Sequence, residues 1–467
     1  MKKKRSFKIA VTCFVFFVFF FVFQINLCAL SRSRNATRSS NINPGRKHLK
    51  LKTVWLNRTS LPPPPPSQAS PQARKINCDR SNKAYDLCTI HGPTFLDPTV
   101  STFYLVDPQS QGPSPPLHSM EKIRPYPRKW ETVTMNRIKE LTLTSGPSSP
   151  PCQVHHNVPA LVFSAGGYTG NFFHDFNDGL IPLFITVKTV FSDDQDFVLV
   201  ISKARDWWVS KYADLLRAFS KYPIINLDND SSTHCFPSAN IGLVSHGFMT
   251  INPKLLPNSQ SFTHFHALLD KAYGHHQNQP SEFNSARKRP RLVITSRSGS
   301  VGRLILNQNE VKKIAQNIGF DVTVFEPTPH TPLREAYALI NSSHAMIGVH
   351  GAALTHSLFL RPGSVFLQVV PLGNEKVAEI CFGNLGRGMG LDYMEYKIGI
   401  EESSLIDKYD KNSLLIKDPV ASQGKNWSDT IMSIYLKEQN VRLDLLRFRE
   451  YLKKAYKKSK KFMEKEG

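Results

Sequence analysis

Acidic residues are scarce in this chain, and the charge balance bears on its partners. Among 467 residues, 37 aspartates and glutamates stand against 59 lysines and arginines, which gives a formal net charge of +22. Such an excess first suggests a nucleic-acid partner. Part of it lies in residues 1–6 and in a lysine-rich tail over 453–465. We interpret the tail as a solvated basic helix end, with contact to an acidic membrane or polysaccharide as the alternative.

Cysteine is also sparse, and its spacing does not match a structural zinc site. The 7 cysteines include no Cys-x-x-Cys pair. Those beyond residue 30 are Cys78, Cys88, Cys152, Cys235 and Cys381. Because this set is odd in number, at least one member stays free or pairs between chains, and Cys78 and Cys88 could close a short loop. Repeats at the periods of solenoid proteins are absent too, which argues against a repeat architecture.

The N-terminus carries a long apolar run. Basic residues at positions 2–5 precede a run over 7–30, whose core at 9–23 is nearly all phenylalanine and valine. This run approaches the ~20 residues that a membrane span needs, so we predict one uncleaved transmembrane anchor. A cleaved signal peptide is the alternative. The basic cluster predicts that residues 1–6 are cytosolic and the rest luminal, a type II topology that argues against nucleic acid as a partner.

Residues 31–75 have few large apolar side chains and contain a proline run at 62–66. Such a segment cannot bury enough surface to offset its ordering entropy, so we predict a disordered, partly extended stem. Glycosylation sequons agree with a luminal location, although the triplet is common by chance. They begin at Asn35, Asn57, Asn229, Asn341 and Asn426.

Beyond the stem, strand-like and helical patterns alternate in two halves, which a polar linker near 275–290 joins. The first half shows strand-like runs at 160–164, 197–201, 224–227 and 241–245, with helical patterns at 172–190 and 207–219. The second shows strands at 291–295, 321–325, 345–349 and 365–370, with helical patterns that begin at a capping box over 307–310 and at Thr331. Alternation of this kind implies parallel sheets covered by helices on both faces.

We therefore predict an α/β protein of two Rossmann-like domains that face a cleft. The first would span 76–280, and the second would span 286–425. Residues 427–467 would form a C-terminal helix and basic tail. We expect that helical region to pack back across the first half.

A strand, a glycine turn, a short helix and a second strand follow one another over 345–371. An apolar run ends before His350 and Gly351, and a helix-like segment covers 353–360. The unit places the N–H groups of Gly351, Ala352 and Ala353 at a helix N-terminus, facing the carboxyl end of a parallel sheet. Such a place suits a phosphate or diphosphate. The alternative is a buried crossover whose glycine only permits a tight turn.

A second loop, over 295–303, follows the first strand of the second half and carries Arg297 and Arg303 around glycine and serine residues. Two guanidinium groups there could bind a diphosphate and stabilise it as a leaving group. A flexible basic surface loop is the alternative. Because both loops leave the same predicted sheet edge, together they favour a phosphate site.

In the first half, His174 and Asp178 follow a glycine-rich turn and lie four residues apart, so they share a helix face. An imidazole oriented by a carboxylate can accept the proton of a hydroxyl nucleophile. The alternative is an acidic helix N-terminus favoured by the dipole.

Two Asp-x-Asp triplets could bind a metal, at 194–196 and 228–230. Both lie in polar turns, and we interpret them as solvated turns. Arginines and a helix N-terminus can stabilise a diphosphate without a metal. We therefore predict no metal ligands and no cofactor beyond the donor substrate.

These residues resemble the plant members of glycosyltransferase family 61. The resemblance spans 78–396 and rests on the segments at 170–184, 294–311 and 348–373, in the expected order. It is greatest to the xylan-decorating clade, not to the N-glycan core xylosyltransferases. It implies a GT-B fold, a Golgi type II membrane enzyme, inversion at the anomeric carbon and a UDP-sugar donor. The resemblance further implies that the second half binds most of the donor and that the first half binds the acceptor. Members of this clade transfer xylose or arabinofuranose to xylan.

The resemblance also assigns roles to residues of this chain. The donor segments of the family are matched by Arg297 and Arg303, by His350 and Gly351 with Ala352, and by Thr355 and His356 one helical turn further on. The first-half motif is matched by His174 and Asp178, either of which is our candidate base, and Asp175 is a third.

The expected reaction is a single displacement, in which a xylan hydroxyl attacks the donor's anomeric carbon and UDP leaves. Aromatic residues could stack on the acceptor, with a core position as the alternative for each; they are Tyr168, Phe172, Trp207 and Trp208. Other open interpretations are an N-glycan or another wall polymer as acceptor, a catalytically silent glycan-binding scaffold, and a luminal hydrolase. The choice between xylose and arabinofuranose stays open, because pocket geometry decides it.

Overall fold

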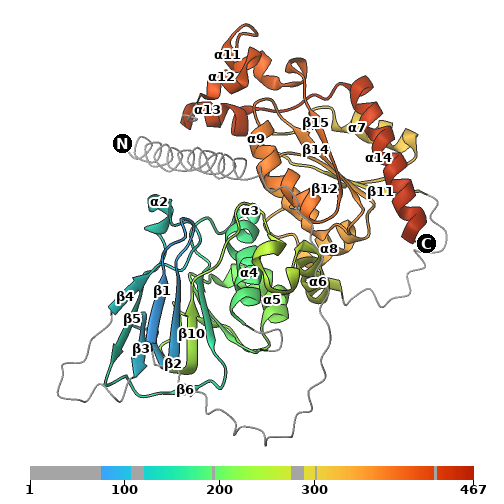
Figure 1. The fold of residues 1–467 in the computed structure, drawn as a ribbon. Helices are drawn as coiled ribbons and strands as arrows, with labels where there is room; N and C mark the ends of the chain where they lie inside the picture. The colour runs from blue at the N-terminus through green and yellow to red at the C-terminus, as the bar shows by residue number, and fades with distance from the viewer. Residues whose placement is uncertain are drawn as a thin grey trace, which may run out of the picture.

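A computed structural model describes residues 75–106, 120–191, 195–274, 289–299, 302–424 and 429–466. The predicted cytosolic tip and anchor, nearly all of the stem and most of the linker lie outside these residues. Among the helices described, none is long and apolar enough to cross a membrane. The described chain is a mixed α/β structure with two sheets, one on either side of residues 275–288 (Figure 1).

The first sheet has ten strands in the order β4-β5-β3-β2-β10-β7-β8-β9, with β1 paired to β2 and β6 to β10. The strands are β1 (Lys75–Asp79), β2 (Leu87–Asp97), β3 (Thr102–Val106), β4 (Met120–Ile123), β5 (Leu141–Gly146), β6 (Val154–His155), β7 (Ala160–Ser164), β8 (Val198–Ser202), β9 (Ile225–Asn226) and β10 (His234–Ile241).

Only part of this sheet matches the predicted parallel arrangement. Strands β10, β7, β8 and β9 run parallel, as expected, but β2 pairs antiparallel with β1, β3 and β10. Short connections rather than crossover helices join β1, β2 and β3, and such connections give antiparallel pairs. The predicted strand at 241–245 is wrong, because β10 ends at Ile241.

Helices cover the first sheet on the side that faces the second half (Figure 1). On that side lie α3 (Phe172–His174), α4 (Ile181–Val190), α5 (Asp206–Phe219) and α6 (Phe262–Tyr273), and the π-helix η2 (Asp175–Leu180) joins α3 to α4. This half also contains α2 (Thr132–Met135) and the short 3-10 helices η3 (Pro253–Leu255) and η4 (Pro257–Ser259). The helical patterns predicted at 172–190 and 207–219 are confirmed. The π-helix inside the first of them holds Asp175 and Asp178, and such bulges often accompany functional sites.

The second sheet is entirely parallel, with five strands in the order β12-β11-β13-β14-β15. They are β11 (Arg291–Thr295), β12 (Asp321–Phe325), β13 (Ala345–Val349), β14 (Val365–Val370) and β15 (Asp392–Lys397). The four strands predicted here are confirmed, and β15 is a fifth. The connecting helices are α7 (Gln308–Ile318), α8 (Leu333–Asn341), the 3-10 helix η6 (Ala352–Phe359), α9 (Glu375–Ala378), the π-helix η7 (Glu379–Gly383) and α10 (Asn384–Gly388).

The C-terminal segment packs on the second half, so the expectation that it crosses the first half is wrong. Its last helix, α14 (Leu445–Glu466), lies against α7, β14 and β15 (Figure 1). Its buried face includes Phe448, Leu452 and Ala455, a helical stripe that faces this sheet. The preceding short helices are η8 (Ile400–Glu402), η9 (Ser404–Asp407), α11 (Leu414–Lys417), α12 (Pro419–Gln423), α13 (Asp429–Ser433) and η10 (Ile434–Glu438).

Asn307 helps to fix this packing, which corrects the predicted capping box. Its side chain makes no cap hydrogen bond to α7. Instead, its Nδ2 donates to the carbonyl oxygen of Leu443 at 2.8 Å, and its Oδ1 accepts from the N–H of Leu443 at 3.0 Å. The amide therefore joins the start of α7 to the segment that leads into α14.

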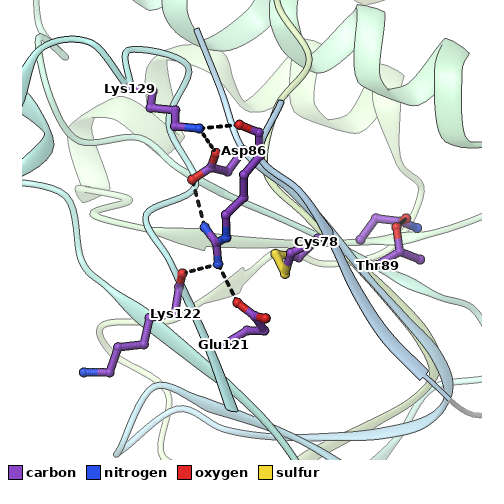
Figure 2. The surroundings of a disulfide bond; sticks show 9 residues. Cys78, Asp86, Thr89, Glu121, Lys122 and Lys129 are labelled. Atoms are coloured by element: carbon purple, nitrogen blue, oxygen red, sulfur yellow. Dashed lines mark hydrogen bonds and ion pairs between the residues drawn. A yellow bond between two sulfur atoms is a disulfide. The ribbon is translucent and has the colours of Figure 1, made fainter. Parts of the chain in front are cut away.

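Two disulfides close the first half. Cys78 and Cys88 face each other on β1 and β2 with their Cα atoms 4.0 Å apart, which confirms the predicted short loop (Figure 2). Beside them, Arg80 pairs with Asp86 and Glu121. Cys152 bonds to Cys235, and Cys381 is buried and not part of a disulfide, so the predicted odd cysteine is confirmed.

The two halves meet through packed side chains. Phe176 of the first half and Phe359 of the second lie edge to face, with ring centroids 6.4 Å apart. Nearby, Arg334 of α8 donates to Asp214 of α5 at 2.6 Å. Contacts of this kind fix the walls of the space between the sheets.

Candidate functional site

A cavity of about 360 Å³ lies between the two halves, at the carboxyl ends of β11 and β12 and at the start of η6. Carboxyl ends of parallel strands are the usual ligand-binding edge of such sheets. The first half contributes Gly170, Phe172 and Lys211. The loops and helix of the second half contribute Ser296, Arg297, Ser298, Glu326, Pro327, Thr328, Pro329, Thr331, Leu333, Ala352, Ala353 and His356.

The two predicted arginines converge on the predicted glycine. A Cβ atom built on Gly351 would collide with the guanidinium of Arg297 and would lie 3.0 Å from Nη1 of Arg303. The φ of Gly351 is +155°, a backbone conformation that side chains rarely adopt. Glycine is therefore needed here both for the turn and for the close approach of the guanidinium groups.

This arginine pair has little compensating negative charge. In the part of the chain that the structure describes, neither guanidinium pairs with a carboxylate, and Nε of Arg303 is buried without a hydrogen-bond partner. Burial lowers the pKa of Arg303 to about 9, and the neighbouring charge of Arg297 adds to the effect. Burial also lowers the pKa of Arg297. Two like charges partly removed from water form a strong site for an anion.

His350 lies beside this pair and is held by a side chain that the sequence analysis did not identify. Gln368, on β14, donates from Nε2 to Nδ1 of His350 at 2.9 Å, and Oε1 of Gln368 accepts from the hydroxyl of Tyr393 at 2.7 Å. With Nδ1 as acceptor, the imidazole carries its proton on Nε2. Burial, followed by the charges of Arg303 and Arg297, lowers the pKa of His350 to about 3, so the ring is neutral near pH 7.

The start of η6 lines the cavity only in part. Ala352 and His356 are lining residues, whereas Thr355 is fully buried and is not among them. His356 places Nδ1 2.8 Å from the carbonyl oxygen of Ala353, and its ring stacks on Phe172 with centroids 4.2 Å apart. Burial lowers the pKa of His356 to about 4. This stack closes one side of the cavity with residues from both halves.

In the first half, His174 and Asp178 come together as their spacing predicts, with Nδ1 of His174 2.9 Å from Oδ2 of Asp178. Both side chains are buried, and neither lines the 360 Å³ cavity. The guanidinium of Arg128 makes two contacts of 2.8 Å with the carboxylate of Asp178. The same carboxylate accepts from the hydroxyl of Tyr126 at 2.9 Å and from the Asn177 amide at 2.6 Å.

The surroundings of Asp178 and His174 shift the pKa of each side chain and give the two groups different roles in proton transfer. Burial alone would raise the pKa of Asp178, but the charges and hydrogen bonds of Arg128 and His174 outweigh it and hold the pKa well below its usual range. Burial lowers the pKa of His174, although Asp178 opposes the shift. Asp178 is thus a weak proton acceptor that orients its neighbours. Nδ1 of His174 lies 2.9 Å from Oδ2 of Asp178 and 3.0 Å from Nη2 of Arg128. In the tautomer that donates from Nδ1 to Asp178, Nε2 is an acceptor.

The segment at 124–131 supplies members of this cluster that the sequence analysis missed. Besides Tyr126 and Arg128 it brings Glu131, which accepts a short hydrogen bond from the hydroxyl of Tyr168. Burial raises the pKa of Glu131 to about 7. No local motif marks this segment, because its partners lie far away in the sequence and only the folded sheet brings them together.

Asp175, the third candidate base, lies on the other side of α3. Its carboxylate accepts from the hydroxyl of Tyr212 at 2.8 Å and from the N–H of Gly170 at 3.2 Å. Burial raises its pKa to about 6. Its contact with Gly170 places it just behind the cavity wall.

The Asp-x-Asp triplets make ordinary pairs where the structure describes them. Asp228 pairs with Lys139 at 3.3 Å, Asp230 with His234 at 3.1 Å, and Asp194 lies outside the described residues. Across the described ranges, the one group with metal-ligand spacing is Cys152, His155 and Cys235, whose cysteines form a disulfide. The expectation of a metal-independent site stays a prediction.

A parallel five-stranded sheet, a cavity at its carboxyl edge and a closely spaced arginine pair define an α/β protein with a site between its two sheets that suits an anion. Comparison with known sequences gives the family. Residues 172–367 match the model described as Glycosyltransferase 61. The chain is 41% identical over 409 residues to the xylan glycosyltransferase MUCI21 of Arabidopsis thaliana. The alignment covers 84% of this chain and 81% of that protein.

Two rice proteins (Oryza sativa subsp. japonica) are also similar. The beta-1,2-xylosyltransferase XYXT1 is 35% identical over 81% of this chain and 83% of its own length. The alpha-1,3-arabinosyltransferase XAT3 is 35% identical over 82% of this chain and 65% of its own length. The chain belongs to glycosyltransferase family 61, and the predicted likeness to the xylan-decorating proteins is confirmed.

Proposed function

We propose that this protein transfers a pentose, xylose or arabinofuranose, from a UDP-sugar to the xylan backbone, with inversion. Its relatives are named as xylan glycosyl-, xylosyl- and arabinosyltransferases. The observation that carries the proposal is the pair of arginines without carboxylate partners over Gly351, beside a cavity large enough for a sugar nucleotide. We further propose a GT-B arrangement and a Golgi type II location through an anchor at 7–30.

In this proposal the donor's diphosphate lies against Arg297 and Arg303. The Nε2–H of His350 and the backbone N–H groups that open η6 add neutral donors. The negative charge that grows on the departing UDP is then met by groups already in place, which is the main way such sites lower the barrier. Because two guanidinium groups supply this charge, we propose that a metal is not required.

The acceptor hydroxyl attacks the anomeric carbon from the face opposite the diphosphate. The new glycosidic C–O bond forms as the bond to the diphosphate oxygen breaks, and the hydroxyl proton passes to a base. We propose His174 as this base and Asp178 as the residue that orients it, because the oxygens of Asp178 are already occupied by donors. Because His174 is buried, we propose that side chains around it move when the acceptor binds and so let Nε2 reach the hydroxyl.

A transfer assay tests the proposal. The full chain would be offered xylohexaose with UDP-xylose or UDP-arabinofuranose, with and without EDTA, beside the variants Arg297→Ala and Lys465→Ala. We expect addition of one pentose from one donor, no loss with EDTA, and loss of product in Arg297→Ala alone; Lys465→Ala is a control for loss of a remote positive charge. UDP binding without any product on xylohexaose would contradict the xylan assignment and point to another acceptor or to a silent scaffold. Free pentose without a longer product would indicate a hydrolase.

A further inference from the structure

Trp207, the second residue of α5, is an exposed aromatic at the edge of the cavity. Its side chain is 44% exposed, whereas that of its neighbour Trp208 is 1% exposed and belongs to the core. A Cβ built on Gly170, which lines the cavity, would lie 3.7 Å from Cη2 of Trp207. Lys211, one helical turn further along α5, also lines the cavity. The indole therefore borders the cavity on the side of the first half.

The other aromatic candidates near the cavity are already engaged by the protein. Tyr168 stacks on His174 with centroids 4.6 Å apart, and Phe172 stacks on His356 at 4.2 Å. For Trp207, by contrast, no stacking or edge contact with another ring is present within the described part of the chain. Trp207 is thus the candidate whose ring still has room for a ligand.

An exposed indole beside a polar cavity suits the flat face of a sugar ring. Indole combines a large apolar surface with a polar N–H at its edge, so it can contact C–H groups and still leave hydroxyls in water. A xylopyranose ring has no exocyclic carbon, so each of its faces is flat enough to lie on an aromatic ring. A polymer of such rings can cover an indole while one residue of the chain enters the cavity.

We propose that Trp207 is a stacking platform for a xylosyl ring of the acceptor, next to the residue that receives the pentose. This inference rests on the proposed function, because it takes the acceptor to be xylan. It places the acceptor chain over the start of α5, on the side of the cavity opposite the arginine pair. It assigns Trp207 to acceptor binding and leaves donor binding to the second half.

Binding of xylohexaose to the full chain, measured by calorimetry, tests this platform. The variants are Trp207→Ala, Trp207→Phe and, as a control, Leu446→Ala, which removes an apolar side chain 80% exposed on α14. We expect Trp207→Ala to weaken xylohexaose binding roughly tenfold, the Phe variant to recover part of it, and the control to match wild type. UDP affinity should stay within about twofold in every variant. A thermal melt confirms that each variant is folded.

The outcomes separate this inference from the proposed function. Equal xylohexaose binding by wild type and Trp207→Ala, or no binding by wild type, would overturn the platform. If wild type binds xylohexaose through Trp207 but transfers no pentose to it, the platform stands and the proposed transfer fails. If wild type transfers pentose, Trp207→Ala should raise the acceptor KM and leave kcat nearly unchanged.

Discussion

Gly351 lies directly beneath the guanidinium group of Arg297, with no space between them for a methyl group. The turn after β13 and the loop after β11 are therefore one unit, although about fifty residues of sequence separate them. The shape of the anion site depends on this contact as much as on the charges it brings together.

Gly351→Ala is expected to weaken UDP binding about tenfold or more, because the new Cβ displaces Arg297 and strains the turn. Calorimetric titration with UDP measures the change. Gly179→Ala is the matched control, since a Cβ there meets no atom within 4 Å. UDP binding that is unchanged in Gly351→Ala would show that Arg297 does not hold the diphosphate.

Replacing Asp178 should mainly lower stability, whereas replacing His174 should mainly lower the rate of transfer. Asp178→Asn removes the closer of the two carboxylates that pair with the buried Arg128, since Glu131 lies 3.9 Å from its guanidinium, and we expect a loss of roughly 3–5 kcal/mol in unfolding free energy. His174→Gln keeps a polar group of similar reach, so we expect a folded protein whose pentose transfer falls by roughly 100-fold or more. Chemical denaturation and initial rates distinguish the two. Full activity in a folded His174→Gln protein would remove His174 as the base.

Glu131 should make stability fall as pH rises from about 4.5 to about 7. Burial raises its pKa from an ordinary 4.5 to about 7, so in this range the folded state holds more protons than the unfolded state. The contribution is present in full below pH 4.5 and is lost by pH 7, a change of about 3 kcal/mol. Melting temperatures across this range, compared with those of Glu131→Gln, measure it. Parallel curves for the two proteins would contradict the assignment.

The C-terminal helix should be part of the folded second half. Phe448 is 1% exposed, whereas Leu446, two residues before it, is 80% exposed. We expect Phe448→Ala to lower the unfolding free energy by about 3–5 kcal/mol and Leu446→Ala to change it by less than about 0.5 kcal/mol. Urea denaturation checks both. A similar, small effect of the two substitutions would mean that α14 is not packed in solution.

The second half was predictable because each of its strands is a short apolar run bounded by turn residues. The segments at 345–349 and 365–370 show this pattern clearly, and parallel strands buried on both faces have it by necessity. The two loops that we propose for the diphosphate could be placed for the same reason: a loop that follows such a strand must lie at the carboxyl edge.

Other features depend on contacts that no local pattern reveals. Along β2 and the start of β5, buried residues alternate with less buried ones, and no crossover helix joins β1, β2 and β3, so the rule of strand and helix alternation did not find these strands. The apolar stripe of α14 shows that a helix packs, but not on which sheet. Arg128 and Glu131 belong to the His174 cluster only through tertiary structure. Thr355, assigned from the resemblance, is fully buried and does not line the cavity, although the three-residue period of η6 aligns it with Ala352, which does.

Under the proposed function, the charge of Arg297 and Arg303 also affects the release of UDP after each transfer. Two guanidinium groups that stabilise the diphosphate as it leaves also bind the UDP product tightly. We therefore expect UDP to be a strong product inhibitor and its release to limit turnover. Inorganic phosphate and sulfate would compete for the same guanidinium groups. The overall rate of sugar transfer would then depend on how fast another reaction hydrolyses UDP, as much as on the transfer step itself.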